Sequence, residues 1–533
     1  MLLHHIVFTV LILCWRVEPI CRFPPPSHFQ PITHANHIFN TIHSSLRQWG
    51  SSLNHNGMSL FPAIVPRGTV LYHGTSVPDP VTGLQWVAFE KDHALQFAHL
   101  YLSPAPIPPI RGPEAFEKAH EDKEGRICSK KKQRVLQTRQ GLRDSDPIWI
   151  LPGYLHSYLA RRDLRLLYLD GSAAATTNKG TLDVSDLLLL NDSQLRTDSE
   201  DERARRLCQI AATDWSGRID GFVRMETGFE IIICSFADSL RLVEALRTED
   251  IDNGGTAIGR ADIYHWLRAA AARYDGIGGS PRRVQLNYNT FVTAYAYSLD
   301  LFQNDSTTLP RLTAGPQNIL EDMRGDVKFM ISQSDSFDEI NQRSCNWQAV
   351  ADMIVQKYAN PLQHLVTSPE FESSTRLAQE LNFMLRPFFD TLNRDAEMET
   401  KRCAAEFLPP DLQSFDPNNC VDSLSEKAIY SVSYRICSTL TNVLWSLYPS
   451  SSTRPHEGRP TQHLASLRDL TSYLAWTEWK KCKGCSWAEI CSIPMFPFGV
   501  VEDHERPCCR GVDSLGGLMG YWDDNESEGN QCR

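Results

Sequence analysis

Residues 70–76 read VLYHGTS and mark the first well-defined structural unit of the chain. The apolar and aromatic residues 70–72 predict a β-strand, and the HGT triplet that follows ends it, because glycine favours turns. Residues 86–89 (WVAF) predict a second strand, and Asp92 is a residue type that caps the N-terminus of a helix. This stretch therefore predicts two strands followed by a helix.

Further strand patterns follow along the chain. Apolar runs rich in β-branched and aromatic residues predict strands at residues 148–151, 154–159, 164–169, 221–225 and 229–235. The stretch 202–212 predicts a helix between them. Strands mixed with helices predict an α+β domain.

The pattern changes after residue 250. Residues 251–259 form a glycine-rich linker candidate, and residues 263–273 predict a helix. From residue 320 onward apolar residues recur every three or four positions, as Trp347, Val350 and Ile354 do, which is typical of amphipathic helices. The second half is therefore predicted to be mainly helical and, because of its cysteines, rich in disulfides.

These shifts predict four parts: a signal peptide at residues 1–22, an α+β domain at 23–250, a mainly helical domain at 251–475 and a cysteine-rich tail at 476–533. The proline-rich and charged residues 104–146 are expected to form a disordered insertion in the α+β domain. Its basic run KKKQR is expected to be a solvated loop, with a furin-like processing site or a polyanion-binding patch as the alternative.

The N-terminal residues predict entry into the secretory pathway. Residues 6–15 (IVFTVLILCW) form an apolar run that suits a signal peptide and is shorter than the ~20 residues that span a bilayer. A buried N-terminal strand and an uncleaved anchor are the alternatives. No later segment resembles a transmembrane helix, so a secreted, extracellular protein without a stable membrane span is expected.

Composition narrows the classes of partner. The chain has 533 residues, of which 42% are hydrophobic and 22% charged, as in an ordinary globular protein. Its formal net charge is −11, which argues against nucleic acid as a partner, because phosphate binding requires a basic surface.

Fifteen cysteines are expected to serve mainly in disulfides, since a secreted chain meets an oxidising compartment. The CKGC motif also has the spacing of a zinc knuckle or a redox pair, but a second matching pair and a thioredoxin-like context are missing, so no metal is expected. The disulfide candidates are Cys403, Cys420, Cys437, Cys482, Cys485, Cys491, Cys508, Cys509 and Cys532.

Three Asn-x-Ser/Thr sequons in polar, loop-like contexts agree with secretion. The glycosylation candidates are Asn191, Asn304 and Asn525. A fourth polar stretch, residues 250–255 (DIDNGG), hints at a calcium loop but lacks the acid that an EF-hand carries at its twelfth position, so a turn is expected.

Two stretches together resemble the core of the ADP-ribosyltransferase superfamily, particularly its His-Tyr-Glu branch. They are VLYHGTS at residues 70–76 and FEIIICSFADSLRLVEAL at residues 229–246. In that branch a strand ends in His-Gly-Ser/Thr, an aromatic strand and a helix follow, and a late strand begins with glutamate. The resemblance covers under half of the chain, and it implies a split sheet for the N-terminal half.

The resemblance also implies a site for NAD as the substrate. Glu230 would stabilise the positive charge that develops on the ribose when the nicotinamide–ribose bond breaks. His73 would bind the adenosine-side ribose, and the backbone of Gly74 would bind the nicotinamide carboxamide. Phe89 or Phe97 would stack on the nicotinamide ring. The branch's tyrosine on the aromatic strand is missing, because that strand reads QWVAFE.

A second resemblance covers most of the chain. The runs SSLRQWGSSLNHNGMSLFPA, LYHGTS, RYDGIGGS and MFPFGVVEDHERPCCR look like those of an uncharacterised family of fungal secreted proteins. It implies no activity. Two functions therefore remain open: ADP-ribosyl transfer or NAD glycohydrolysis, and a non-catalytic binding or structural protein on a disulfide-stabilised scaffold.

Overall fold

A computed structural model describes residues 32–102, 149–192, 200–248, 260–278, 283–302, 309–312, 316–333, 346–408, 423–448, 460–514 and 520–522. The predicted signal peptide, the insertion with its basic run, the linker and the DIDNGG turn lie outside these residues, as do Asn304, Cys420, Asn525 and Cys532.

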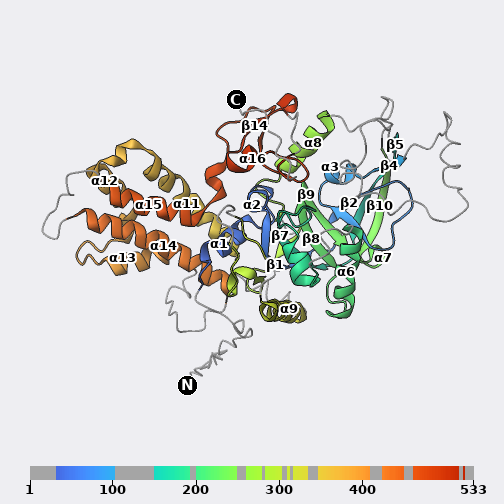
Figure 1. Cartoon of the computed structure of the whole chain (residues 1–533), viewed down its shortest axis with the longest axis horizontal. Coiled ribbons are helices and arrows are strands. Elements are labelled where there is room, and N and C mark those ends of the chain that lie inside the picture. Colours follow the sequence, from blue (N-terminus) through green and yellow to red (C-terminus); the bar gives the residue numbers. More distant parts are fainter. Residues whose placement is uncertain are drawn as a thin grey trace, which may run out of the picture.

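One large sheet organises the N-terminal half (Figure 1). Its strands are β1 (Asn56–Val65), β2 (Val70–Thr75), β3 (Gln85–Ala88), β6 (Tyr154–Ala160), β7 (Leu164–Gly171), β8 (Gly221–Glu226), β9 (Gly228–Ile233), β10 (Leu240–Arg247), β11 (Gln285–Leu286) and β12 (Val292–Thr293). The order is β10-β6-β2-β3-β9-β8-β7-β1-β11, with β12 also paired to β1. Only β7 and β8 run parallel among these pairs. A separate pair joins β4 (His99–Leu102) to β5 (Trp149–Pro152).

The predicted strands are present, and several further strands were not predicted, of which β1 and β10 are the longest. β1 is buried along its whole length, so both of its faces are covered and it lacks the alternation that marks a half-exposed strand. β10 is an edge strand and mostly exposed, so it carries little apolar signal. Both are held by pairing with distant residues, β1 with β7 and β10 with β6.

The helices near the sheet are α2 (Gln48–Leu53), α3 (Lys91–Leu95), α6 (Glu200–Thr213), α7 (Phe236–Ser239), α8 (Arg260–Ala271) and α9 (Gln317–Ser332), with a π-helix at Val184–Leu189. Those of the helical part are α1 (Ala35–Ser44), α11 (Trp347–Thr367), α12 (Ser374–Leu385), α13 (Ala396–Ala404), α14 (Leu424–Leu447) and α15 (Thr461–Leu474). The prediction of an α+β first half and a mainly helical second half is thereby confirmed.

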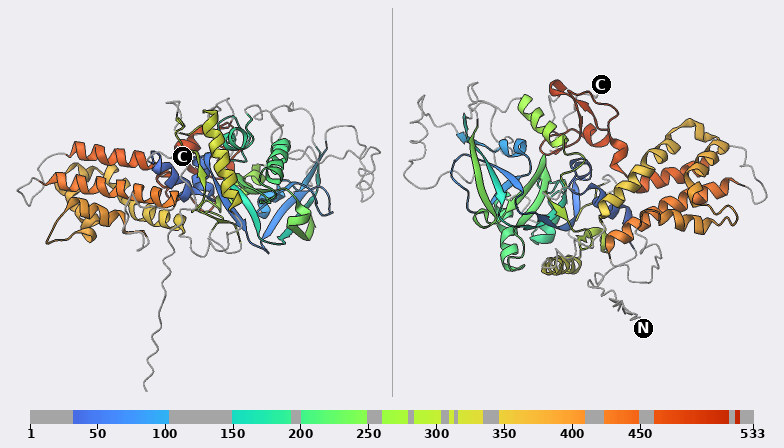
Figure 2. Two further views of the ribbon diagram at one scale, coloured as in Figure 1. Left: turned by 90° about the horizontal axis from the view of Figure 1, so that it is seen from below. Right: turned by 180° about the vertical axis from the view of Figure 1, so that it is seen from behind.

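The helical bundle forms one end of the molecule and the sheet the other (Figures 1 and 2). α1 precedes the sheet in sequence but packs with the bundle. Its Asn36 and Asn40 side chains donate hydrogen bonds to the carbonyl oxygens of Tyr473 (2.6 Å) and Leu474 (2.9 Å) at the end of α15. The N-terminal segment therefore ties the bundle to the sheet.

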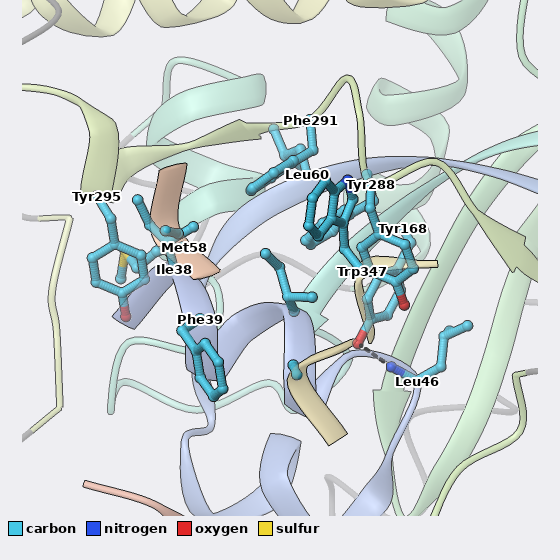
Figure 3. Close-up of a cluster of buried hydrophobic side chains, with 14 of the residues drawn as sticks. Ile38, Phe39, Leu46, Met58, Leu60, Tyr168, Tyr288, Phe291, Tyr295 and Trp347 are labelled. Carbon is cyan, nitrogen blue, oxygen red and sulfur yellow. Dashed lines mark hydrogen bonds between the residues drawn. The ribbon is translucent and has the colours of Figure 1, made fainter. Parts of the chain in front are cut away.

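A buried aromatic cluster joins the two ends (Figure 3). Phe61 of β1 stacks on Phe291 with ring centroids 4.5 Å apart, and the backbone nitrogen of Leu46 donates to the hydroxyl of Tyr168 at 3.2 Å. β11 and β12, which lie beyond residue 250, add to the same sheet. The sheet thus extends past the predicted domain boundary at residue 250. The sequence did not reveal β11 and β12, because each strand has only two residues, too few for a recognisable pattern.

Four disulfides are defined in the described residues: Cys208–Cys234, Cys403–Cys437, Cys482–Cys491 and Cys485–Cys509. Cys508 is also disulfide-bonded. The prediction of disulfides is confirmed for these candidates, and Cys208–Cys234 was not foreseen. Because both cysteines of the CKGC motif pair with other partners, the motif is neither a zinc knuckle nor a redox pair.

The cysteine-rich tail, with β13 (Ile490–Ser492), α16 (Val501–Glu505) and β14 (Cys508–Arg510), packs against α2 and α8. Trp49 and Trp266 share a small core there with Met495 and Phe498. Within the described ranges, no helix is long and apolar enough to cross a membrane. Asn191 is exposed, and its side-chain oxygen accepts a hydrogen bond from Gln317.

Candidate functional site

A cavity of about 220 Å³ opens beside β2 and β3. Four of the five residues predicted for the NAD site line it, although they come from three separate stretches of the chain: His73, Gly74, Phe97 and Glu230. Phe89 lies instead in the main hydrophobic core and is not among the lining residues. The other lining residues are Tyr72, Thr75, Ser76, Val77, Val81, Gln85, Trp86, Val87, Ala88, His93, Ala94 and Asp201.

The cavity lies where two neighbouring strands separate. β2 pairs with β6 along its whole length but with β3 at one position, Tyr72 opposite Ala88. Ala88 in turn lies opposite Glu230 of β9, so these three side chains share one face of the sheet. His73, the next residue of β2, leaves on the other face, and its Nδ1–H donates to the carbonyl oxygen of Trp86 at 2.6 Å across the gap.

Gly74 has a structural reason to be glycine. A Cβ atom there would lie 2.1 Å from the carbonyl oxygen of Ala94 and 2.6 Å from the backbone nitrogen of Ala98. These are backbone atoms that cannot move aside, so a side chain would push the end of α3 away from β2. Glycine therefore brings α3 and Phe97 up to the wall of the cavity.

Glu230 is fixed by a buried ion-pair network. Arg224 Nη2 lies 2.5 Å from Glu230 Oε1 and 2.5 Å from Glu200 Oε1, and its side chain has no exposed surface. Arg203 continues the network by pairing with Glu200 and Asp186 at 2.8 and 2.7 Å. The carboxylate at the cavity wall thus has a defined position.

Burial raises the pKa of Glu230, and Arg224 opposes this effect. Burial also raises the pKa of Glu226 well above its usual value, and repulsion from Glu230 adds to the rise. These two carboxyl groups are therefore coupled, and a proton or a cation near one of them stabilises both.

His93 approaches the same carboxylates from α3. Its Nδ1–H donates to the carbonyl oxygen of Thr227 at 2.7 Å, an oxygen that also accepts from Trp266 Nε1 at 3.1 Å. Burial lowers the pKa of His93 to about 4, so the ring is neutral near pH 7. Because Nδ1 carries the proton, Nε2 carries the lone pair. Gly228 has φ +103°, and a Cβ there would lie 2.8 Å from His93 Nδ1.

Arg224, Glu226 and His93 were not predicted as site residues. A signal was present: residues 224–230 read RMETGFE, with three charges on alternating positions of two otherwise apolar strands. Charged residues are rarely buried unless paired, so such a pattern indicates either an exposed strand face or a buried polar cluster. The sequence does not distinguish these two cases.

A second, larger cavity of about 350 Å³ lies between the sheet and the bundle and includes Asn40, Asp170, Tyr295 and Trp476 in its lining. Asp170 Oδ1 accepts a hydrogen bond from the backbone nitrogen of Ser59 at 2.8 Å. Burial raises the pKa of the Asp170 carboxyl to about 7. This cavity contains none of the predicted site residues.

The chain has relatives in yeast. Residues 27–254 match the family model of the YPL277C N-terminal domain. Uncharacterized protein YOR389W of Saccharomyces cerevisiae (strain ATCC 204508 / S288c) is 33% identical over 219 residues, which cover 39% of this chain and 33% of that protein. Uncharacterized protein YPL277C of the same yeast is 34% identical over 228 residues, which cover 39% of this chain and 42% of that protein.

The chain thus spans less than half the length of these curated relatives. The matches support the predicted similarity to an uncharacterised fungal family, and the residues matched by the family model include His73 and Glu230. No solved structure matches the chain.

Proposed function

We propose that the cavity beside β2 and β3 binds the nicotinamide–ribose part of NAD, that the surrounding sheet is of the ADP-ribosyltransferase type, and that the protein cleaves the nicotinamide–ribose bond. The supporting observation is that His73, Gly74, Phe97 and Glu230 line one cavity. Its volume is below the roughly 300–1,000 Å³ of common ligand pockets. It therefore suits one end of the dinucleotide, with the adenosine half extending outward.

In the proposed reaction, the bond between ribose C1′ and the nicotinamide nitrogen breaks, and the electron pair leaves with nicotinamide. A water molecule, or an acceptor nucleophile, forms the new bond to C1′ and releases its proton to solvent. The carboxylate of Glu230 stabilises the positive charge that builds on the ribose, and Arg224 fixes its position. Trp86 Nε1–H is buried without a hydrogen-bond acceptor in the described structure and is free to donate to a ligand.

Replacing Glu230 with glutamine tests this proposal. Because glutamine keeps the shape but not the charge, we expect nicotinamide release from NAD to fall roughly 10²–10³-fold. The measurement is nicotinamide release by the purified, fully oxidised protein, with the thermal unfolding midpoint recorded to show that the variant folds. Glu244→Gln is the control, since Glu244 is exposed on β10, and its activity should equal that of the wild type.

Two outcomes contradict the proposal: no nicotinamide release by the wild type, or equal release by Glu230→Gln. The first outcome favours the alternative function, a binding or structural protein on a disulfide-stabilised scaffold.

We also propose that the protein is secreted, with cleavage of the signal peptide within residues 17–22, and that it is glycosylated at its sequons. Disulfides joining distant elements, such as Cys208–Cys234 between α6 and the end of β9, support an oxidising compartment. We expect expression in a eukaryotic secretory host to deliver the chain to the medium with the four defined disulfides, seen by non-reducing peptide mapping. Retention in the cytosol with free thiols would contradict secretion.

A further inference from the structure

We propose that His93, Glu226 and Glu230 form a binding site for one divalent transition-metal cation of the Zn²⁺ or Mn²⁺ type, at the wall of the cavity beside β2 and β3. One ligand atom from each of the three side chains lies within 4.8 Å of the other two. Of the residues assigned to NAD binding, the metal site uses Glu230 alone. The proposal of a metal site therefore does not depend on whether the protein cleaves NAD.

The separation of the ligand atoms is close to what a metal requires. With bonds of about 2.1 Å to nitrogen and oxygen, ligand atoms in a tetrahedral site lie roughly 3.4 Å apart. Closing from 4.8 Å therefore takes side-chain displacements on the order of 1 Å. Glu226 is less buried than His93 and Glu230, so its side chain is the least confined of the three.

His93 is oriented as a metal ligand would be. Metal-binding histidines donate their second ring N–H to a carbonyl or carboxylate oxygen, which fixes the tautomer and the ring position. Here Nδ1 donates to the carbonyl oxygen of Thr227, and Nε2 presents its lone pair. Thr227 is itself held by Trp266, and Gly228 leaves the space that the imidazole needs. This support is built from three separate elements.

The charge of the cluster also suits a dication. The connected buried network contains four carboxylates, Asp186, Glu200, Glu226 and Glu230, and two guanidinium groups, Arg203 and Arg224. With every group ionised, two negative charges are in excess, and a buried excess of charge is strongly unfavourable unless a proton or a cation compensates it. A divalent cation between the ligand atoms compensates both.

The donor set decides the class of cation. One imidazole nitrogen with two carboxylate oxygens suits Zn²⁺ or Mn²⁺ better than Ca²⁺ or Mg²⁺, which prefer oxygen ligands alone. Three protein ligands leave a coordination position open for water or a substrate. Since Glu230 and His93 line the cavity, that open position would face it. Because the proposed NAD reaction also needs Glu230, we expect the bound cation to inhibit it.

The test is direct metal binding by the untagged, EDTA-treated protein with its disulfides intact, so that thiols do not compete. Titration calorimetry with Zn²⁺ and with Mn²⁺ is expected to show one binding site, and Mg²⁺ should bind there with lower affinity. The thermal unfolding midpoint should rise when the metal binds. Glu226→Gln removes one ligand at a half-buried position and should weaken binding by roughly 100-fold or more.

Asp201→Asn is the matched control, because Asp201 lines the same cavity but is not one of the three ligands, and its dissociation constant should change by only a few-fold. Absence of one-to-one binding by the wild type, or equal affinity in Glu226→Gln, overturns the proposal. Since NAD is absent from this titration, failure of the metal site is distinguished from failure of NAD cleavage.

Discussion

Replacing Arg224 with methionine is expected to destabilise the protein by about 3–5 kcal/mol, the cost of removing one partner from a buried ion pair. Arg224 is fully buried, and the same Nη2 atom serves Glu200 and Glu230 at 2.5 Å. Methionine fills a similar volume, but it removes the ion-pair partner of Glu230 and leaves Glu200 paired with Arg203, although both carboxyl groups are almost fully buried. The free energy of unfolding in urea measures the loss.

The control is Arg162→Met. Arg162 also forms a two-bond ion pair, with Asp220, but 46% of its side chain is exposed, so its loss should cost less than about 1 kcal/mol. Combining Arg224→Met with Glu230→Gln should recover part of the lost stability, because one unpaired carboxylate is then removed. Equal costs for Arg224→Met and Arg162→Met would contradict the prediction that burial makes the network essential.

Replacing Asp170 with asparagine is expected to remove a pH dependence of the free energy of unfolding. This dependence amounts to up to about 4 kcal/mol, since each unit of pKa shift corresponds to about 1.36 kcal/mol. The folded pKa of about 7 lies above the usual value of 3.8. Between these values the folded state binds the proton and the unfolded state does not. The contribution of Asp170 to stability is therefore full below about pH 4, falls as the pH rises through 4–7, and is constant above 7.

Urea unfolding of both proteins at several pH values between 4 and 8 measures this effect. The stability of Asp170→Asn relative to the wild type should rise from pH 4 to pH 7 and then level off. Asp79→Asn is the control, because Asp79 is exposed, and its difference from the wild type should stay nearly constant. A difference for Asp170→Asn that does not vary with pH would show that the carboxyl is hydrated in the folded protein.

The local sequence pattern was sufficient to predict most of the longer strands and helices. Strands such as β2, β6, β7 and β9 and helices such as α11 and α14 have their own apolar periodicity, so each is visible in its own residues. The disulfide role of the tail cysteines also followed from composition and from the predicted oxidising compartment. β1, β10, β11 and β12 were missed because their pairing depends on strands far away in sequence.

The candidate site was only partly accessible from sequence. His73, Gly74 and Glu230 stand in short motifs whose spacing carries a chemical meaning, so they could be named. Phe89 was assigned to the site by proximity in sequence, but in the structure it is buried in the core. Whether a side chain points to the core or to a cavity depends on the twist and pairing of the strands, which a short motif does not encode.

The sequence by itself determined that strands and helices alternate in the first half, that helices dominate the second, and that a strand-end His-Gly and a late glutamate are present. Only the tertiary structure decided that β2 and β3 separate after one pair, so that His73 and Glu230 line the same cavity. It also decided that His93, Glu226 and Arg224 gather around Glu230. The physical reason is that hydrophobic periodicity acts along a few neighbouring residues, whereas ion pairs and ligand sets form between residues that only folding brings together.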